Sequence, residues 1–130
     1  MALAIYWSLA FVVTHVPPFL PDADDDEPEP LIGLDKVVHF LGYAGLAFVL
    51  MNALVRPADA AAQAADAERP TIRSFRRGVV ITILCCAVYG ALDELTQPPF
   101  GRTADPMDYV ADLLGLAAGL LAFRLSRRTR

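Results

Sequence analysis

The chain has 130 residues, enough for one domain; 55% of them are hydrophobic and 20% are charged. Most of the charges lie between four long apolar stretches, which excludes a small soluble enzyme and a disordered chain. The formal net charge of −4 excludes a nucleic-acid-binding protein, because such a protein needs a basic face. We therefore expect an all-α integral membrane protein, a four-helix bundle in which residues 1–130 form a single domain.

The apolar stretches predict the helices in chain order, since a membrane-spanning helix needs about 17–25 residues. We expect helices at about residues 1–18, 36–55, 78–97 and 106–124. The first stretch lacks the basic start and the small-residue cleavage site of a signal peptide, so we expect it to remain as a helix. The Ala-rich segment at residues 57–70 favours a further short helix outside the membrane.

Basic residues predict the orientation of the bundle. Nine of the eleven Lys and Arg residues lie in two segments, residues 56–77 and 124–130. Basic segments stay in the cytoplasm, which places both chain termini there and the acidic residues 22–29 outside. Residues 71–77 form a basic collar that suits anionic membrane lipids.

Small residues predict where helices approach closely. The fourth helix carries Ala111, Gly115 and Gly119 at intervals of four residues, a pattern that lets two backbones pack together. Gly42 and Gly45 offer a similar notch on the second helix.

Polar residues collect at one end of the predicted helices, and the expected topology places all of them on the exoplasmic side: Asp35, Lys36, His39, Asp93, Glu94, Gln97, Arg102, Asp105, Asp108 and Asp112. Ionisable residues in membrane spans are costly and usually mark a functional site. Asp105 has a structural explanation, because Asp followed by Pro is typical of a helix start. Three pairs spaced four residues apart each share a helix face: Asp35 with His39, Asp93 with Gln97, and Asp108 with Asp112.

The charges of this group do not balance. Lys36 and Arg102 could pair with Glu94 and Asp108 and so pin the helices together, and this structural interpretation stays open. Carboxylates left unpaired at membrane depth should bind protons, a metal ion, or the hydroxyl and ammonium groups of a ligand. Carboxylates beside His39 would suit a hard divalent cation. No tight motif such as His-Glu-x-x-His occurs, however, so the sequence assigns no metal ligands and no cofactor.

Three motifs at these positions resemble the signatures of VanZ-like membrane proteins: Asp35-Lys36-Val37-Val38-His39-Phe40 with Tyr43 and Leu46, Tyr89-Gly90-x-x-Asp93-Glu94-x-x-Gln97 followed by Phe100-Gly101-Arg102, and Asp108-x-x-x-Asp112-x-x-Gly115. The resemblance covers about residues 34–119, and the first helix adds nothing to it. The family often has Asn where this chain has Asp112. Its name comes from a protein associated with resistance to the glycopeptide teicoplanin, and no settled reaction goes with it.

We therefore expect an integral protein of a bacterial cytoplasmic membrane whose exoplasmic site binds a polar lipid-linked or cell-envelope headgroup. The resemblance implies a link to glycopeptide-type envelope stress. The expected partners are membrane lipids and a lipid-linked envelope precursor or glycopeptide-related ligand, with no nucleic acid. The expected ligand-binding residues are Asp35, Lys36, His39, Asp93, Glu94, Gln97, Arg102, Asp108 and Asp112.

Roles within this set follow from charge. Lys36 and Arg102 would hold phosphate or another anion, and His39 with Glu94 would handle protons or bind a metal. Two alternatives stay open. One is a membrane enzyme, a hydrolase or transferase acting on a lipid or glycan headgroup, with His39 and Glu94 as the candidate catalytic residues. The other is a non-catalytic structural subunit with a salt-bridged bundle interior.

Overall fold

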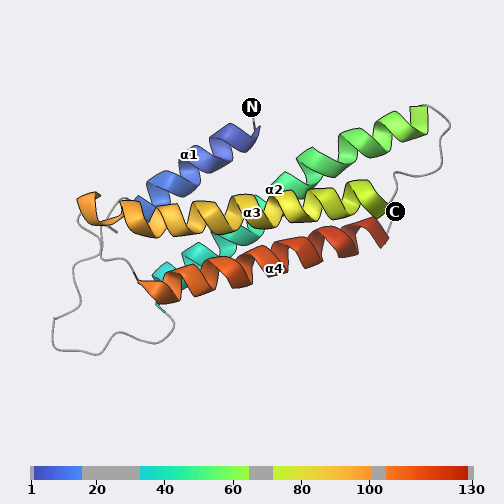
Figure 1. The fold of residues 1–130 in the computed structure, drawn as a ribbon. Coiled ribbons are helices and arrows are strands. Elements are labelled where there is room, and N and C mark those ends of the chain that lie inside the picture. The colour runs from blue at the N-terminus through green and yellow to red at the C-terminus, as the bar shows by residue number, and fades with distance from the viewer. Residues whose placement is uncertain (1, 16–32, 65–71, 101–104, 129–130) are drawn as a thin grey trace.

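The structure is a computed structural model that describes residues 2–15, 33–64, 72–100 and 105–128. These residues form four α-helices and one short 3₁₀ helix, and they contain no strand (Figure 1). In chain order the elements are α1 (Ala2–His15), α2 (Leu34–Ala64), α3 (Ile72–Thr96), η1 (Pro98–Phe100) and α4 (Pro106–Arg128). The expected all-α fold is confirmed.

Three of these helices are long and apolar enough to cross a membrane, over Leu34–Pro57, Ser74–Thr96 and Pro106–Arg128. With 14 residues, α1 is about 21 Å long and shorter than a hydrocarbon core of roughly 30 Å. Many large apolar side chains of the long helices are exposed, as is typical of faces in contact with lipid: Leu41, Val80, Leu84, Val88, Leu92, Leu114 and Leu121. The chain is a multi-pass membrane protein.

Two helices are longer than the sequence predicted. The separate short helix expected over residues 57–70 is wrong, because α2 continues through Pro57 and the Ala-rich residues after it to Ala64. α3 begins at Ile72 and not near residue 78, so Arg76 and Arg77 lie on its exposed first turns. Hydropathy marks the part of a helix that matches the lipid, and a helix can continue into water with Ala, Arg and Gln, which are good helix formers.

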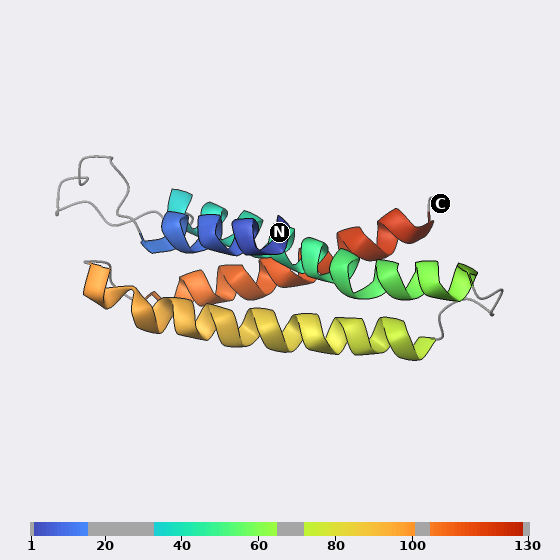
Figure 2. The same ribbon diagram turned by 90° about the horizontal axis from the view of Figure 1, so that it is seen from above.

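α2 and α4 make the most extensive helix–helix contact, and α3 packs against both of them (Figures 1 and 2). A side chain at Gly115 would collide with the backbone carbonyl of Phe40, and one at Gly119 with that of Ala44. The small residues of α4 therefore face the backbone of α2, as their spacing predicted.

The notch predicted on α2 holds a side chain of α1. The hydroxyl of Tyr6 donates a hydrogen bond to the carbonyl oxygen of Gly42 at 2.6 Å, and a side chain at Gly45 would collide with the Tyr6 ring. Only Gly45 therefore acts as the predicted notch, because a side-chain carbon added at Gly42 would meet no atom of the described residues within 4 Å.

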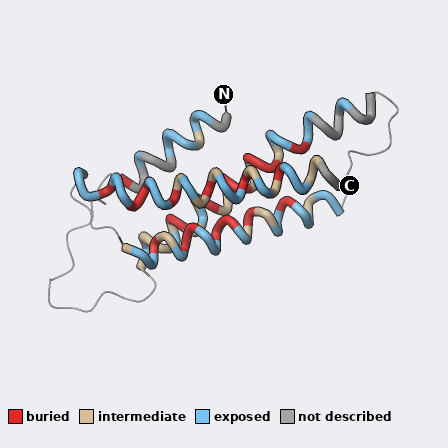
Figure 3. Tube along the Cα trace, viewed as in Figure 1, coloured by how far each residue is buried: buried red, intermediate tan, exposed pale blue. Residues whose placement is uncertain are grey.

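Buried residues run along the inner faces of the helices (Figure 3), and two clusters among them are apolar. The larger lies midway along the bundle and contains Tyr43, Leu46, Ala47, Leu50, Cys86 and Leu116. The smaller, the Phe123 cluster, contains Met51, Val55 and Phe123. Beside it the guanidinium carbon of Arg127 lies 5.8 Å from the centre of the Phe75 ring, a cation–π contact near the basic end.

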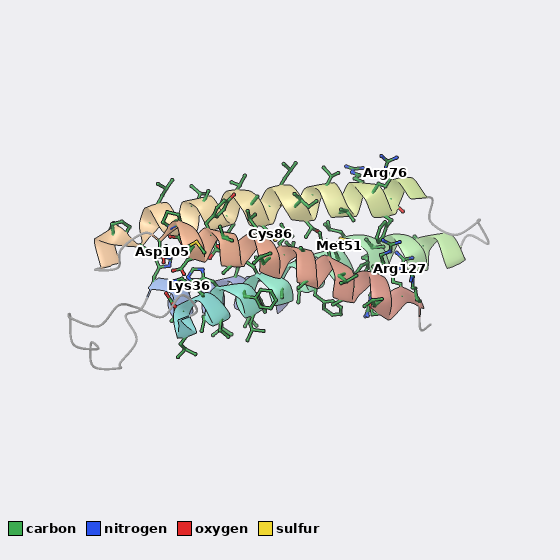
Figure 4. All side chains as sticks on the ribbon, turned by 90° about the horizontal axis from the view of Figure 1, so that it is seen from below. Lys36, Met51, Arg76, Cys86, Asp105 and Arg127 are labelled. Carbon is green, nitrogen blue, oxygen red and sulfur yellow. The ribbon has the colours of Figure 1, made fainter. Side chains whose placement is uncertain are left out.

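The bundle has one basic end and one acidic end. Figure 4 shows Arg76 and Arg127 at the end opposite Lys36 and Asp105. The end of α2, the start of α3 and the end of α4 share the basic end (Figure 1). The described parts of the two basic segments therefore lie at the same end of the bundle, as expected if both face the same side of the membrane. That this end faces the cytoplasm stays a prediction.

Candidate functional site

Side chains from three helices meet where α2 and α4 begin and α3 ends (Figure 4). We call this group the polar end: Asp35, Lys36, His39, Glu94, Gln97, Asp105, Asp108 and Asp112. Its outer members, Asp35, Lys36 and Asp105, are partly exposed, while the others are buried. Asp35 and Asp108 lie in the first turns of α2 and α4, where the helix dipole favours a carboxylate.

Lys36 forms the outer layer of the polar end. Its ammonium nitrogen lies 2.8 Å from Asp105, 3.2 Å from Asp35 and 3.4 Å from Asp108. Asp105 also accepts a hydrogen bond from the backbone N–H of Met107 at 2.8 Å, which confirms its role at the start of α4. The Lys36 ammonium, with this hydrogen bond, holds the pKa of the Asp105 carboxyl below its usual value.

His39 forms the inner layer. Its side chain is 1% exposed, and its Nδ1 atom lies 2.9 Å from Oδ1 of Asp112, which is also 1% exposed. Its other ring nitrogen, Nε2, lies 3.8 Å from Oδ2 of Asp108 and makes no hydrogen bond with the described residues. Because an ionised carboxylate can only accept, the hydrogen bond to Asp112 puts a proton on Nδ1.

Glu94 joins the end of α3 to the start of α4. One carboxylate oxygen accepts a hydrogen bond from the backbone N–H of Asp105 at 2.9 Å. The other lies 3.3 Å from the side-chain nitrogen of Gln97. No Lys or Arg among the described residues forms an ion pair with Glu94. Of the pairings that the sequence suggested for Lys36, the structure shows the one with Asp108, and it adds Asp105.

A glycine lets the deepest carboxylate approach α3. A side chain at Gly90 would lie 3.0 Å from Oδ2 of Asp112 and 3.2 Å from the ring of Tyr109. These separations are tighter than almost all real contacts of that kind, so Gly90 allows α4 to pack at this depth. Gly90 of the second motif therefore has a role in helix packing, in addition to any role of the carboxylates that follow it in the motif.

A second buried histidine was missed in the sequence. His15, at the end of α1, lies 3.5 Å from Asp93 through Nδ1 and 2.9 Å from the hydroxyl of Thr96 through Nε2. It is 2% exposed. A signal was present, because His15 is the only His, Lys, Arg, Asp or Glu in the first apolar stretch and such residues usually mark a site. Asp93, expected in the ligand site, contacts this histidine.

Several buried atoms of the polar end form no hydrogen bond with the described residues: Nε2 of His39, Oε1 of Gln97, Oδ1 of Asp108 and Oδ2 of Asp112. Oδ1 of Asp108 does lie within ion-pair distance of Lys36. The two carboxylate oxygens and the Gln97 amide oxygen can only accept hydrogen bonds while the carboxylates are ionised. This end of the bundle therefore offers its acceptors to a cation or to a molecule that carries hydrogen-bond donors.

The structure brings together seven of the nine residues expected in the ligand site: Asp35, Lys36, His39, Glu94, Gln97, Asp108 and Asp112. Asp93 pairs with His15 beside them, and Arg102 lies outside the described residues. Whether these residues bind a ligand stays a prediction.

Comparison with known protein families gives one match. The VanZ/LLP1 family model matches residues 3–127, nearly the whole chain. The chain belongs to the VanZ/LLP1 family. The resemblance inferred from the three motifs is thus confirmed, and it extends further than expected, since the match includes α1. Searches of curated proteins and of solved structures gave no match.

For a VanZ/LLP1 protein, the inclusion of α1 changes how the site is interpreted. The sequence motifs left the first helix out, yet His15 of α1 contacts Asp93 of the second motif. The matched region therefore carries both buried histidines, His15 beside Asp93 of α3 and His39 beside Asp108 and Asp112 of α4.

Proposed function

We propose that this membrane protein binds a polar headgroup of a lipid-linked or cell-envelope molecule at its polar end, on the exoplasmic side. The observation that supports the proposal most is the pair of buried acceptor oxygens, Oε1 of Gln97 and Oδ2 of Asp112, that accept no hydrogen bond from a described residue. Acceptors buried without donors are costly, so a ligand that supplies hydroxyl or ammonium groups would stabilise this end.

The position suits a headgroup. The polar end lies at the ends of the three membrane-spanning segments, where lipid headgroups lie in a bilayer. Asp35 and Asp105 are partly exposed, whereas the acceptors of Gln97 and Asp112 are buried. Lys36 already bonds to Asp35 and Asp105, so it could hold an anion only by releasing one of them. We therefore favour a headgroup recognised through its donors, as in a sugar or an amine.

A membrane enzyme acting on the same headgroup is the catalytic form of this proposal. His39 and Glu94 would then be the candidate catalytic residues, because a buried imidazole beside carboxylates can move a proton.

A structural role is the second candidate, and two contacts favour it. Lys36 joins the start of α2 to the start of α4, and His15 joins the end of α1 to the end of α3. In this function the polar end would hold four helices in register and need no ligand.

Native mass spectrometry of gently solubilised protein tests the proposal. Wild-type protein incubated with vesicles of bacterial polar lipid extract, including lipid-linked envelope precursors, should retain one class of headgroup. His39→Gln and Glu94→Gln should each abolish that retention, and the double variant should add little, because groups of one site act together. Thr82→Val is the matched control, since Thr82 is buried in α3 away from the polar end and its hydroxyl oxygen also lacks a hydrogen bond.

Thermal unfolding in detergent separates the two candidates. A binding site predicts variants that stay folded and lose the ligand. If the variants unfold at markedly lower temperature and wild-type protein retains no lipid, the structural role replaces the proposal.

A further inference from the structure

We infer that His39, Glu94 and Asp108 bind a divalent transition-metal ion such as zinc or manganese, with Asp112 holding the imidazole in place. One ligand atom of each residue, from α2, α3 and α4 respectively, lies within 4.8 Å of the other two. All three side chains are buried. This inference does not depend on the headgroup proposal.

The imidazole is the observation that points to a cation. When Nδ1 donates its proton to Asp112 and Nε2 carries none, the Nε2 lone pair of His39 is available to a cation beside the carboxylates. The nearest is Oδ2 of Asp108 at 3.8 Å, too far for a hydrogen bond. An imidazole whose other nitrogen bonds to a carboxylate is the usual arrangement of a metal-binding histidine.

A neighbouring acidic group provides a contrast. Asp35, Asp105 and Asp108 also bring three carboxylate oxygens together, but there the Lys36 ammonium lies within 3.4 Å of each residue. The protein thus supplies its own cation to the outer group. For the inner group, no Lys or Arg in the described part of the chain contacts Glu94, and Lys36 contacts the Asp108 oxygen other than the one nearest His39.

The ligand set selects the class of ion. One imidazole nitrogen with two carboxylates suits zinc or manganese, whereas calcium and magnesium prefer oxygen ligands alone. If the three ligand atoms form a triangle with sides of 4.8 Å, an ion at its centre lies about 2.8 Å from each atom, which is the side divided by √3. Movements of less than about 1 Å per side chain would shorten these distances to the roughly 2.0–2.2 Å of zinc bonds to nitrogen and oxygen. Three protein ligands leave a position for water or another ligand.

Metal binding to the whole chain tests the inference. The purification tag should be removed and the protein should carry a Cys85→Ala/Cys86→Ala background, so that neither tag residues nor thiols bind metal. After chelation and dialysis, Zn²⁺ and Mn²⁺ should each bind at one ion per chain, measured by calorimetry and elemental mass spectrometry. His39→Gln, Glu94→Gln and Asp108→Asn should weaken binding by more than about 100-fold, and Asp112→Asn by about 10- to 100-fold.

Thr82→Val is the matched control, because it changes a buried polar side chain of α3 away from the three ligands and should leave the affinity unchanged. Pulsed electron paramagnetic resonance of wild-type protein with Mn²⁺ should show coupling to an imidazole nitrogen. That coupling should persist in His15→Gln, and it decides the question even where the other variants fail to fold. Absence of saturable binding, or binding without nitrogen coupling, would overturn the inference. Headgroup retention is a separate readout, so either proposal can fail alone.

Discussion

Between α2 and α4, the contact around Phe123 is apolar, whereas the contact around His39 and Asp112 is made of ionisable side chains. The two regions are equally buried, since Phe123 is 2% exposed and Asp112 is 1% exposed. The two regions therefore do not differ in their degree of burial, but they differ in the free energy of burying their side chains. In a bilayer the helices stay in apolar surroundings whether or not they associate, so apolar packing gains mainly van der Waals contact, while a buried carboxylate needs a partner.

The two regions therefore have different roles. The Phe123 cluster fills space between α2, α3 and α4 and involves no charge apart from the neighbouring Arg127. The polar end concentrates carboxylates whose mutual repulsion would be removed by apolar residues of similar size. We therefore expect stability to depend on the apolar contact and ligand or metal binding to depend on the polar end.

The largest expected effect concerns which side of the membrane each end faces. In a Cys85→Ala/Cys86→Ala background, an impermeant maleimide should label Pro99→Cys in intact cells and Ala61→Cys only after lysis. Both positions are exposed, and they lie near the polar and basic ends respectively. The basic residues near Ala61 predict that it is cytoplasmic. The opposite labelling pattern would invert the topology and place the polar end in the cytoplasm.

Next in size is the close approach of α4 to α2. Gly119→Leu should destabilise the protein by roughly 3 kcal/mol or more, because the new side chain meets the backbone of Ala44, which cannot rotate away. Ala117→Leu adds the same side chain on an exposed part of the same helix and should leave folding intact. Folded yield and thermal unfolding in detergent measure both. Equal losses would show that the α2–α4 contact tolerates side chains there.

The sequence predicted the polar end well because charged residues stand out in apolar stretches, and helical spacing placed them at a common depth. It could not predict the order of contacts. The closest partner of Lys36 is Asp105. Which carboxylate lies closest depends on where α4 begins and on the side-chain conformations, and neither can be read from helical spacing. His15 was missed because the first stretch was judged by its apolar length. The end of α2 and the start of α3 were misplaced because hydropathy follows the lipid and not the backbone hydrogen bonds.

Variants in each region test the division of work directly. Phe123→Ala should lower the free energy of unfolding by about 3 kcal/mol. This value is near the low end for such a substitution, because the helices stay in apolar surroundings in the bilayer. Headgroup and metal retention should survive. Glu94→Gln should abolish retention and change stability by less than about 1 kcal/mol, because Gln keeps an acceptor for the Asp105 N–H and removes a charge from a carboxylate-rich group. Thermal unfolding and native mass spectrometry on the same samples measure both effects. Loss of retention in Phe123→Ala, or a large loss of stability in Glu94→Gln, would contradict this division.

The smallest expected effect is the acid sensitivity of the Lys36–Asp105 pair at the edge of the polar end. The pKa of Asp105 is lower in the folded protein than its ordinary value of 3.8, chiefly because its carboxylate accepts a hydrogen bond from Lys36. The stabilisation is therefore fully present above pH 4 and is lost as the pH falls through the lowered folded value. Because the Asp105 side chain is 35% exposed, the contribution should be under about 1 kcal/mol. Asp105→Asn should remove part of the loss of stability that occurs as the pH falls below the ordinary pKa of 3.8, whereas Asp22→Asn in the acidic segment should leave it unchanged. Denaturant unfolding across this fall in pH measures both, and an Asp105→Asn variant with the full wild-type acid response would show that the pair adds nothing to folding.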